Sequence, residues 1–132
     1  MPSTCPIILF ATPDPNARAA AGDALERAGC LTLAAADGAE AVELVRRENG
    51  WVDVAVLDLV MPKMGGLAAL RRLRGCAPGV SVVLACGNTG GVGGRLLGKR
   101  ADALLRKPFD RNELFQAVRQ GLERRRLREP FP

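Results

Sequence analysis

Five short apolar runs alternate with stretches that have the spacing of amphipathic helices, and this alternation restricts the fold more than any other feature. The runs are rich in Val, Leu, Ile and Ala, which is typical of strands buried on both faces of a parallel sheet. The predicted strands are 7–11, 30–35, 52–57, 81–86 and 101–106. Such a series predicts an α/β domain with a doubly wound, five-stranded parallel sheet, right-handed crossovers and helices on both faces.

Capping residues mark the predicted helices. Asp14 followed by Pro15 predicts the start of a first helix, Asp37 caps a second, residues 67–74 form a short third, and Asp110 caps a long last helix. The expected apolar stripe of the first helix is Ala17, Ala20, Ala21, Ala24, Leu25 and Ala28. Those of the second and last helices are Ala41, Val42 and Val45, and Leu114, Ala117, Val118 and Leu122.

Residues 87–98 are the weakest segment, because six of the twelve are Gly. Each Gly costs a helix interior up to about 1 kcal/mol relative to Ala. We therefore expect any helix there to be short, frayed or displaced, with high mobility and fast amide exchange.

Composition and charge restrict the function classes. The 132 residues suffice for one domain, 1–132, with its core at about 5–124 and a basic helix end and tail at 119–132. Five Arg and one Glu in 119–128 supply +4 of the net charge of +5. This local concentration predicts a solvated helix end rather than a nucleic-acid site.

The sequence also lacks the signals of a membrane or secreted protein. No apolar run is long enough to span a membrane, and the first ten residues do not resemble a signal peptide, so we expect a cytoplasmic protein. The four Cys form no CxxC motif and there is no His. Reduced, mostly buried thiols are therefore expected rather than a zinc site.

Asp58 is the strongest candidate for a functional residue. It follows the third apolar run and precedes a loop that contains Pro62, Gly65 and Gly66. Ligands of open α/β sheets bind at the carboxyl ends of the strands. A competing motif, GGRLLGKR at 93–100, is a near match to a phosphate-binding loop, but Arg100 replaces the required Ser or Thr and the preceding strand is too far upstream.

Three motifs in this order resemble the receiver domains of bacterial response regulators, the CheY-like family with a flavodoxin-like fold. Asp14, Pro15 and Asn16 resemble the start of the family's first helix, and Lys107, Pro108 and Phe109 resemble its KPF motif. The phosphoacceptor loop is matched by Asp58, Val60, Met61, Pro62, Met64, Gly65 and Gly66. A weaker likeness, ACGNTGG at 85–91, is similar to the SGYTG segment of receivers that work with hybrid kinases.

The resemblance implies a signalling domain rather than an enzyme. A sensor histidine kinase or another signalling protein would be the partner, and a phosphohistidine would donate to Asp58 with help from Mg²⁺. Lys107 would pair with the phosphoryl group, and Cys86 would stand where the family has a Thr or Ser that reports it. An alternative register puts Ala85 there.

The chain departs from the family at the metal site. The two adjacent acids that hold Mg²⁺ are replaced by Thr12 and Pro13, so this is an atypical member. The remaining candidate ligands are the Asp58 carboxylate, the Val60 carbonyl and Asp14, although Asp14 is better placed to cap the first helix. We therefore expect Mg²⁺ binding to be weak or absent. Leu104 also replaces the aromatic residue of the family's switch.

Two hypotheses follow. In the first, the chain is a phosphorelay receiver that accepts phosphate on Asp58 inefficiently, because its Mg²⁺-dependent phosphorylation is impaired. In the second, it is a pseudo-receiver, a protein-protein interaction module that works without phosphate. The fold also allows a homodimer through the last helices, beside residues 124–128.

Overall fold

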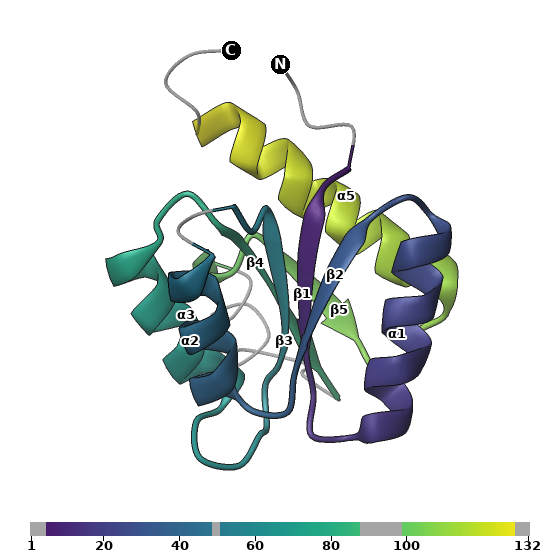
Figure 1. The fold of residues 1–132 in the computed structure, drawn as a ribbon, viewed down its shortest axis with the longest axis horizontal. Helices are drawn as coiled ribbons and strands as arrows, with labels where there is room; N and C mark the ends of the chain where they lie inside the picture. The colour runs from purple at the N-terminus through teal and green to yellow at the C-terminus, as the bar shows by residue number, and fades with distance from the viewer. Residues whose placement is uncertain (1–4, 49–50, 88–98, 129–132) are drawn as a thin grey trace.

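Figure 1 shows the fold in a computed structural model, in which residues 5–48, 51–87 and 99–128 are described. The strands are β1 (Ile7–Ala11), β2 (Leu31–Ala35), β3 (Val54–Asp58), β4 (Ser81–Cys86) and β5 (Ala103–Arg106). The helices are α1 (Pro15–Arg27), α2 (Gly38–Arg47), α3 (Gly66–Cys76) and α5 (Arg111–Arg128). Residues 88–98 lie outside the described residues, and with them the expectation that this segment is mobile.

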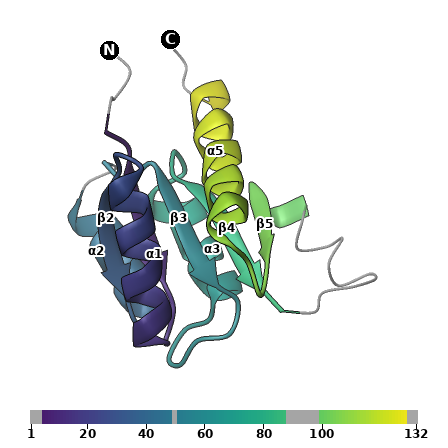
Figure 2. The same cartoon turned by 90° about the vertical axis from the view of Figure 1, so that its right-hand side faces the viewer.

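The five strands form one parallel sheet in the order β2-β1-β3-β4-β5. Helices α1 and α5 cover one face, and α2 and α3 cover the other (Figures 1 and 2). The register pairs Ala11 of β1 with Leu57 of β3, and Asp58 with Ala85 of β4. The predicted doubly wound α/β fold is therefore confirmed, and β3 lies at the centre of the sheet.

Two apolar cores hold the layers together, because alternate side chains of each strand point to opposite faces. The core beneath α2 and α3 includes Leu9, Val45, Ala55, Leu57, Leu73, Val82 and Leu84. The core beneath α1 and α5 includes Ile8, Phe10, Leu25, Val54, Val56, Val83 and Leu114. All residues of β3 and β4 are buried, which confirms that these runs are central strands.

The predicted caps are confirmed at three helix starts. The Asp14 side chain accepts a hydrogen bond from the Asn16 amide, and that of Asp37 accepts one from Glu40 at 2.8 Å. Asp110 and Glu113 exchange two such bonds, with the Glu113 amide donating to Asp110 Oδ1 at 2.8 Å. These bonds satisfy amides that a helix leaves without partners at its first turn.

Two expectations about burial are wrong. Of the predicted α1 stripe only Ala21 and Leu25 are buried, whereas Ala17 and Ala24 are half-buried and Ala20 and Ala28 are exposed. The alanines at positions 17, 20 and 24 instead line a groove of about 820 Å³ beside residues 107–111. None of the four cysteines forms a disulfide, but Cys5 and Cys76 are exposed, and only Cys86 is buried.

An ion pair and two hydrogen bonds connect α5 to the edge of the sheet at which the strands begin. Asp53 Oδ2 accepts from the Ile7 amide at 2.8 Å, and Asp53 Oδ1 lies 2.8 Å from Arg125 Nε. Arg125 also donates to the Gly79 carbonyl. The end of α5 is thus connected to the starts of β1, β3 and β4.

Among the described helices, none is long and apolar enough to cross a membrane.

Candidate functional site

The site lies at the carboxyl edge of the sheet, where the ends of three parallel strands meet. Thr12 follows β1, Asp58 is the last residue of β3, and Lys107 follows β5. Since parallel strands end at the same edge, residues far apart in sequence converge there. Thr12 and Asp58 are buried, with 1% and 3% of their surfaces exposed.

Both oxygens of the Asp58 carboxylate have a close neighbour. Oδ2 accepts a hydrogen bond from Thr12 Oγ1 at 2.7 Å. Oδ1 lies 2.6 Å from Lys107 Nζ and forms an ion pair with it. Among the described residues, no donor has the alignment needed for a hydrogen bond to Oδ1. The structure therefore brings Asp58 and Lys107, two of the candidate site residues, into contact. The pair has no net charge, which limits the cost of burying the carboxylate.

Thr12 is the site residue that the sequence did not single out as a contact. Its main-chain amide donates to the Ala35 carbonyl at 3.1 Å, and its carbonyl accepts from Arg18 Nη1 at 2.7 Å. Its hydroxyl also accepts from the Asp14 amide at 3.3 Å. These bonds hold the hydroxyl against Asp58. A polar side chain directly after a buried strand was the signal for it.

The segment after Asp58 is held in place at both ends. The Leu59 amide donates to the Ala85 carbonyl of β4 at 2.8 Å, and the Gly66 amide returns to the Leu59 carbonyl at 3.0 Å. A Cβ at Gly66 would collide with the Asp58 carbonyl oxygen, so only glycine fits this turn without movement. Val60 is 82% exposed at the rim.

The described residues do not assemble a set of acids around Asp58. Asp14 is exposed and its Oδ1 accepts from the Asn16 amide at 2.9 Å. In the described part of the chain, no cluster of three or more His, Cys, Asp or Glu side chains could hold a metal ion. Mg²⁺ prefers several oxygen ligands in octahedral geometry, including one or two carboxylates. Here Asp58 is the one carboxylate at hand, and both its oxygens are already engaged.

The residues at the ends of β4 and β5 complete the surroundings. Ala85 is the register partner of Asp58, and the buried Cys86 follows it. The Cys86 carbonyl accepts from the Lys107 amide at 2.8 Å, so it helps to place the lysine. The reporting role of Cys86 stays a prediction. Leu104 is partly buried and packs against the core beneath α2 and α3.

Lys107 reaches Asp58 from the groove described above. Its side chain is 42% exposed, whereas that of Asp58 is 4% exposed. Asp14 and Lys107 both line the groove, between α1 and the start of α5. A molecule in this groove would therefore have access to the exposed side of the lysine.

A doubly wound parallel sheet with a buried aspartate at the end of its central strand, paired with a lysine that follows the edge strand β5, defines a receiver-type signalling domain. The sequence model described as "Response regulator receiver domain" matches residues 8–119, and the chain belongs to this family. It is accordingly a receiver domain of two-component signal transduction.

Curated relatives have the same relationship. The chain is 36% identical over 104 residues to the sensor kinase CckA of Brucella abortus, covering 76% of this chain and 11% of that protein. It is 36% identical over 103 residues to the probable transcriptional regulatory protein TcrX of Mycobacterium tuberculosis, covering 76% and 43%. The chain thus spans less than half the length of either relative.

Solved structures agree with the fold. A response regulator receiver domain protein from Clostridium thermocellum superposes with a TM-score of 0.83 at 25% identity, covering 92% of this chain and 98% of that one. The receiver domain of the Francisella response regulator 1452 gives 0.79 at 29% identity, covering 90% and 98%.

Proposed function

We propose that the chain is a phosphorelay receiver whose phosphoacceptor is Asp58 and whose phosphorylation depends only weakly on Mg²⁺. The ion pair between Asp58 and Lys107 at the end of β3 is the observation that supports this function. A cation beside the acceptor lowers the repulsion between the carboxylate and an anionic phosphoryl group.

The transfer would proceed by displacement at phosphorus. The P–N bond of a donor phosphohistidine breaks, its electron pair leaves with the imidazole, and an Asp58 oxygen forms the new P–O bond. Lys107 has to turn from Asp58 Oδ1 to a phosphoryl oxygen, which its exposed and flexible side chain permits. The Thr12 hydroxyl keeps its bond to Oδ2 and fixes the carboxylate plane.

The weak dependence on Mg²⁺ follows from the oxygens available. Thr12 and Pro13 supply no carboxylate, and the Asp14 side chain is engaged in capping α1. Asp58, the Val60 carbonyl and Asp14 remain the candidate ligands, and this set has too little negative charge in one place to replace the water around Mg²⁺.

A second function is favoured by the same contacts. The Asp58 carboxylate already has a hydrogen bond from Thr12 and a counter-ion in Lys107, so it is neutralised without phosphate or metal. The chain would then be a pseudo-receiver that recognises a partner protein directly. For either function we propose a signalling protein as the partner. For the phosphorelay receiver, the phosphodonor would be a cytoplasmic sensor histidine kinase. We also propose that a homodimer would pair through α5.

Intact-mass spectrometry after incubation with acetyl phosphate, with and without Mg²⁺, tests the proposal. We expect a phosphoryl adduct that Asp58→Asn abolishes and that Mg²⁺ accelerates only slightly. Asp14→Asn serves as the matched control for the metal, and its small Mg²⁺ effect should equal that of the wild type. An adduct that strictly requires Mg²⁺ would contradict the weak dependence. No adduct, under conditions that modify an ordinary receiver, would favour the pseudo-receiver.

A further inference from the structure

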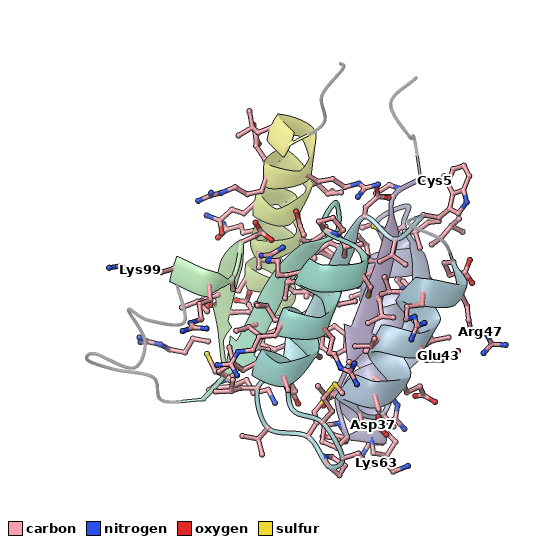
Figure 3. The ribbon with its side chains drawn as sticks, turned by 90° about the vertical axis from the view of Figure 1, so that its left-hand side faces the viewer. Cys5, Asp37, Glu43, Arg47, Lys63 and Lys99 are labelled. Carbon is pink, nitrogen blue, oxygen red and sulfur yellow. The ribbon has the colours of Figure 1, made fainter. Side chains whose placement is uncertain are left out.

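The start of α2 lies directly against the segment that follows Asp58, which we call the acceptor loop (59–65). The Gly38 amide, at the first position of α2, donates to the Met64 carbonyl at 2.8 Å. Asp37, which precedes it, lies near Lys63 of the loop, and Figure 3 shows both side chains at the same end of the molecule. The two segments are joined by main chain as well as by charge.

Gly38 is required here for space. A Cβ at this position would collide with the Met64 carbonyl oxygen, and it would lie 3.0 Å from the Met64 carbonyl carbon and 3.1 Å from Met64 Cγ. Among the described glycines only Gly29 has a positive φ, so the backbone of Gly38 is open to any residue. Since Gly also weakens a helix relative to Ala, its presence at this position fits the close approach of the loop.

Asp37 adds a second connection. Its Oδ1 accepts from the Glu40 amide at 2.8 Å, and its Oδ2 lies 4.0 Å from Lys63 Nζ. Lys63 has a φ of 65°, a conformation that non-glycine residues adopt only where their surroundings support it. The same residue that caps α2 therefore faces the most sharply turned residue of the acceptor loop.

The hydrogen bond from the Gly38 amide connects this loop to α2, an element outside β3, β4 and α3. The loop is held by Ala85 at its start and by Gly66 at its end. Between these points Met64 N donates to Pro62 O at 2.6 Å, which is a bond within the loop. Gly38 thus fixes the loop to the start of α2 at Met64, close to the end of the loop.

We infer that Gly38 is a positioning residue for Asp58: the start of α2 fixes the acceptor loop by close backbone contact, so that a displacement of either one moves the other. The inference rests on the proposed function only for its effect on phosphoryl transfer. Because such coupling is reciprocal, a ligand that displaces the loop also changes the surroundings of the Gly38 amide.

The test compares Gly38→Ala with Gly75→Ala. Gly75 is also helical, but nothing lies within 4 Å of a Cβ built there, so it controls for the substitution itself. Backbone amide spectra of both variants are recorded by NMR. We expect Gly38→Ala to shift the amides of 59–66 and to slow formation of the Asp58 adduct from acetyl phosphate by roughly tenfold or more. Gly75→Ala should change neither.

A second variant protects the test against loss of folding. Asp37→Asn keeps a capping side chain but removes the negative charge beside Lys63. It should shift the amides of the acceptor loop in the same region, by a smaller amount. If the wild type forms no adduct, the proposed function fails, and the amide spectra still decide the role of Gly38. If Gly38→Ala folds and its loop amides are unchanged, the inference is overturned. If Gly38→Ala does not fold, unchanged loop amides in Asp37→Asn would overturn it.

Discussion

The Thr12 hydroxyl and the Asp58 carboxylate are separated by 46 positions in the sequence, yet they form a buried hydrogen bond of 2.7 Å. The bond joins the ends of β1 and β3 at the edge where the family's metal-binding acids would stand. An uncharged side chain has thus become the hydrogen-bond donor to one oxygen of the candidate phosphoacceptor.

Removing this hydroxyl should destabilise the fold. Thr12→Val keeps the shape of the side chain but leaves Asp58 Oδ2 without its donor, and we expect the free energy of unfolding to fall by about 1–3 kcal/mol. Urea unfolding measures it. Thr32→Val is the matched control, because the Thr32 hydroxyl donates to Glu26 in an exposed bond of 3.2 Å. Equal losses in the two variants would contradict a special role for Thr12.

The ion pair between Asp58 and Lys107 should show a measurable but modest coupling. Because the lysine is 42% exposed, solvent weakens the attraction, and we expect a coupling free energy of about 1 kcal/mol. A double-mutant cycle with Asp58→Asn and Lys107→Met measures it by urea unfolding. A coupling indistinguishable from zero would mean that the contact adds nothing to stability.

Restoring the acids should restore the metal site. Thr12→Asp combined with Pro13→Asp places two more carboxylates beside Asp58, which repel one another until a dication binds. We expect this variant to be less stable than the wild type without Mg²⁺, and to gain about 2.7 kcal/mol at a Mg²⁺ concentration one hundred times its dissociation constant. Thermal unfolding with and without Mg²⁺ measures the gain. Adding Asp58→Asn should reduce it, and an equal gain in the wild type would count against the prediction.

Cys30 should make the free energy of unfolding fall as the pH becomes alkaline. Burial raises the pKa of the Cys30 thiol, and the nearby Cys5 and Asp53 raise it further. The unfolded chain therefore loses the thiol proton at lower pH than the folded one. The stability from this difference is fully present below the unfolded pKa and is lost as the pH rises through the folded pKa.

Urea unfolding at neutral and alkaline pH, with a reductant present, checks this prediction. We expect Cys30→Ala to lose less stability than the wild type between the two conditions. Cys76→Ala, which removes an exposed thiol, should behave like the wild type. If Cys30→Ala and the wild type lose the same amount, the thiol does not contribute.

The sequence was most informative where local patterns and tertiary structure agree. The runs that became β3 and β4 are buried throughout, so their apolar composition alone identified them. Asp14 and Asp37 act on amides two and three residues away, which makes capping a local property. Asp58 and Lys107 each follow a predicted strand, and the ends of parallel strands lie at the same edge of a sheet.

The rest depended on contacts that no local pattern encodes. Alanine spacing in α1 indicated a stripe, but how far a helix rolls on a sheet is set by its neighbours, and Ala20 is exposed. The hydrogen bond from Thr12 depends on the position of its hydroxyl, which accepts from the Asp14 amide, and on its main chain, whose carbonyl accepts from Arg18. The close approach of Gly38 to Met64 joins two residues that no local sequence pattern connects.

The neutral pair at the end of β3 also determines what an incoming phosphodonor meets. The family's usual site presents three carboxylates that repel an anion until a dication binds, so its encounter with the donor depends on the metal. Asp58 and Lys107 carry no net charge together, so this pair adds little to the long-range field at this edge of the sheet. The rate at which this domain encounters a donor should therefore depend little on the electric field of Asp58 and Lys107. Ionic strength should change that rate mainly through the other charges on the surfaces of the domain and the donor.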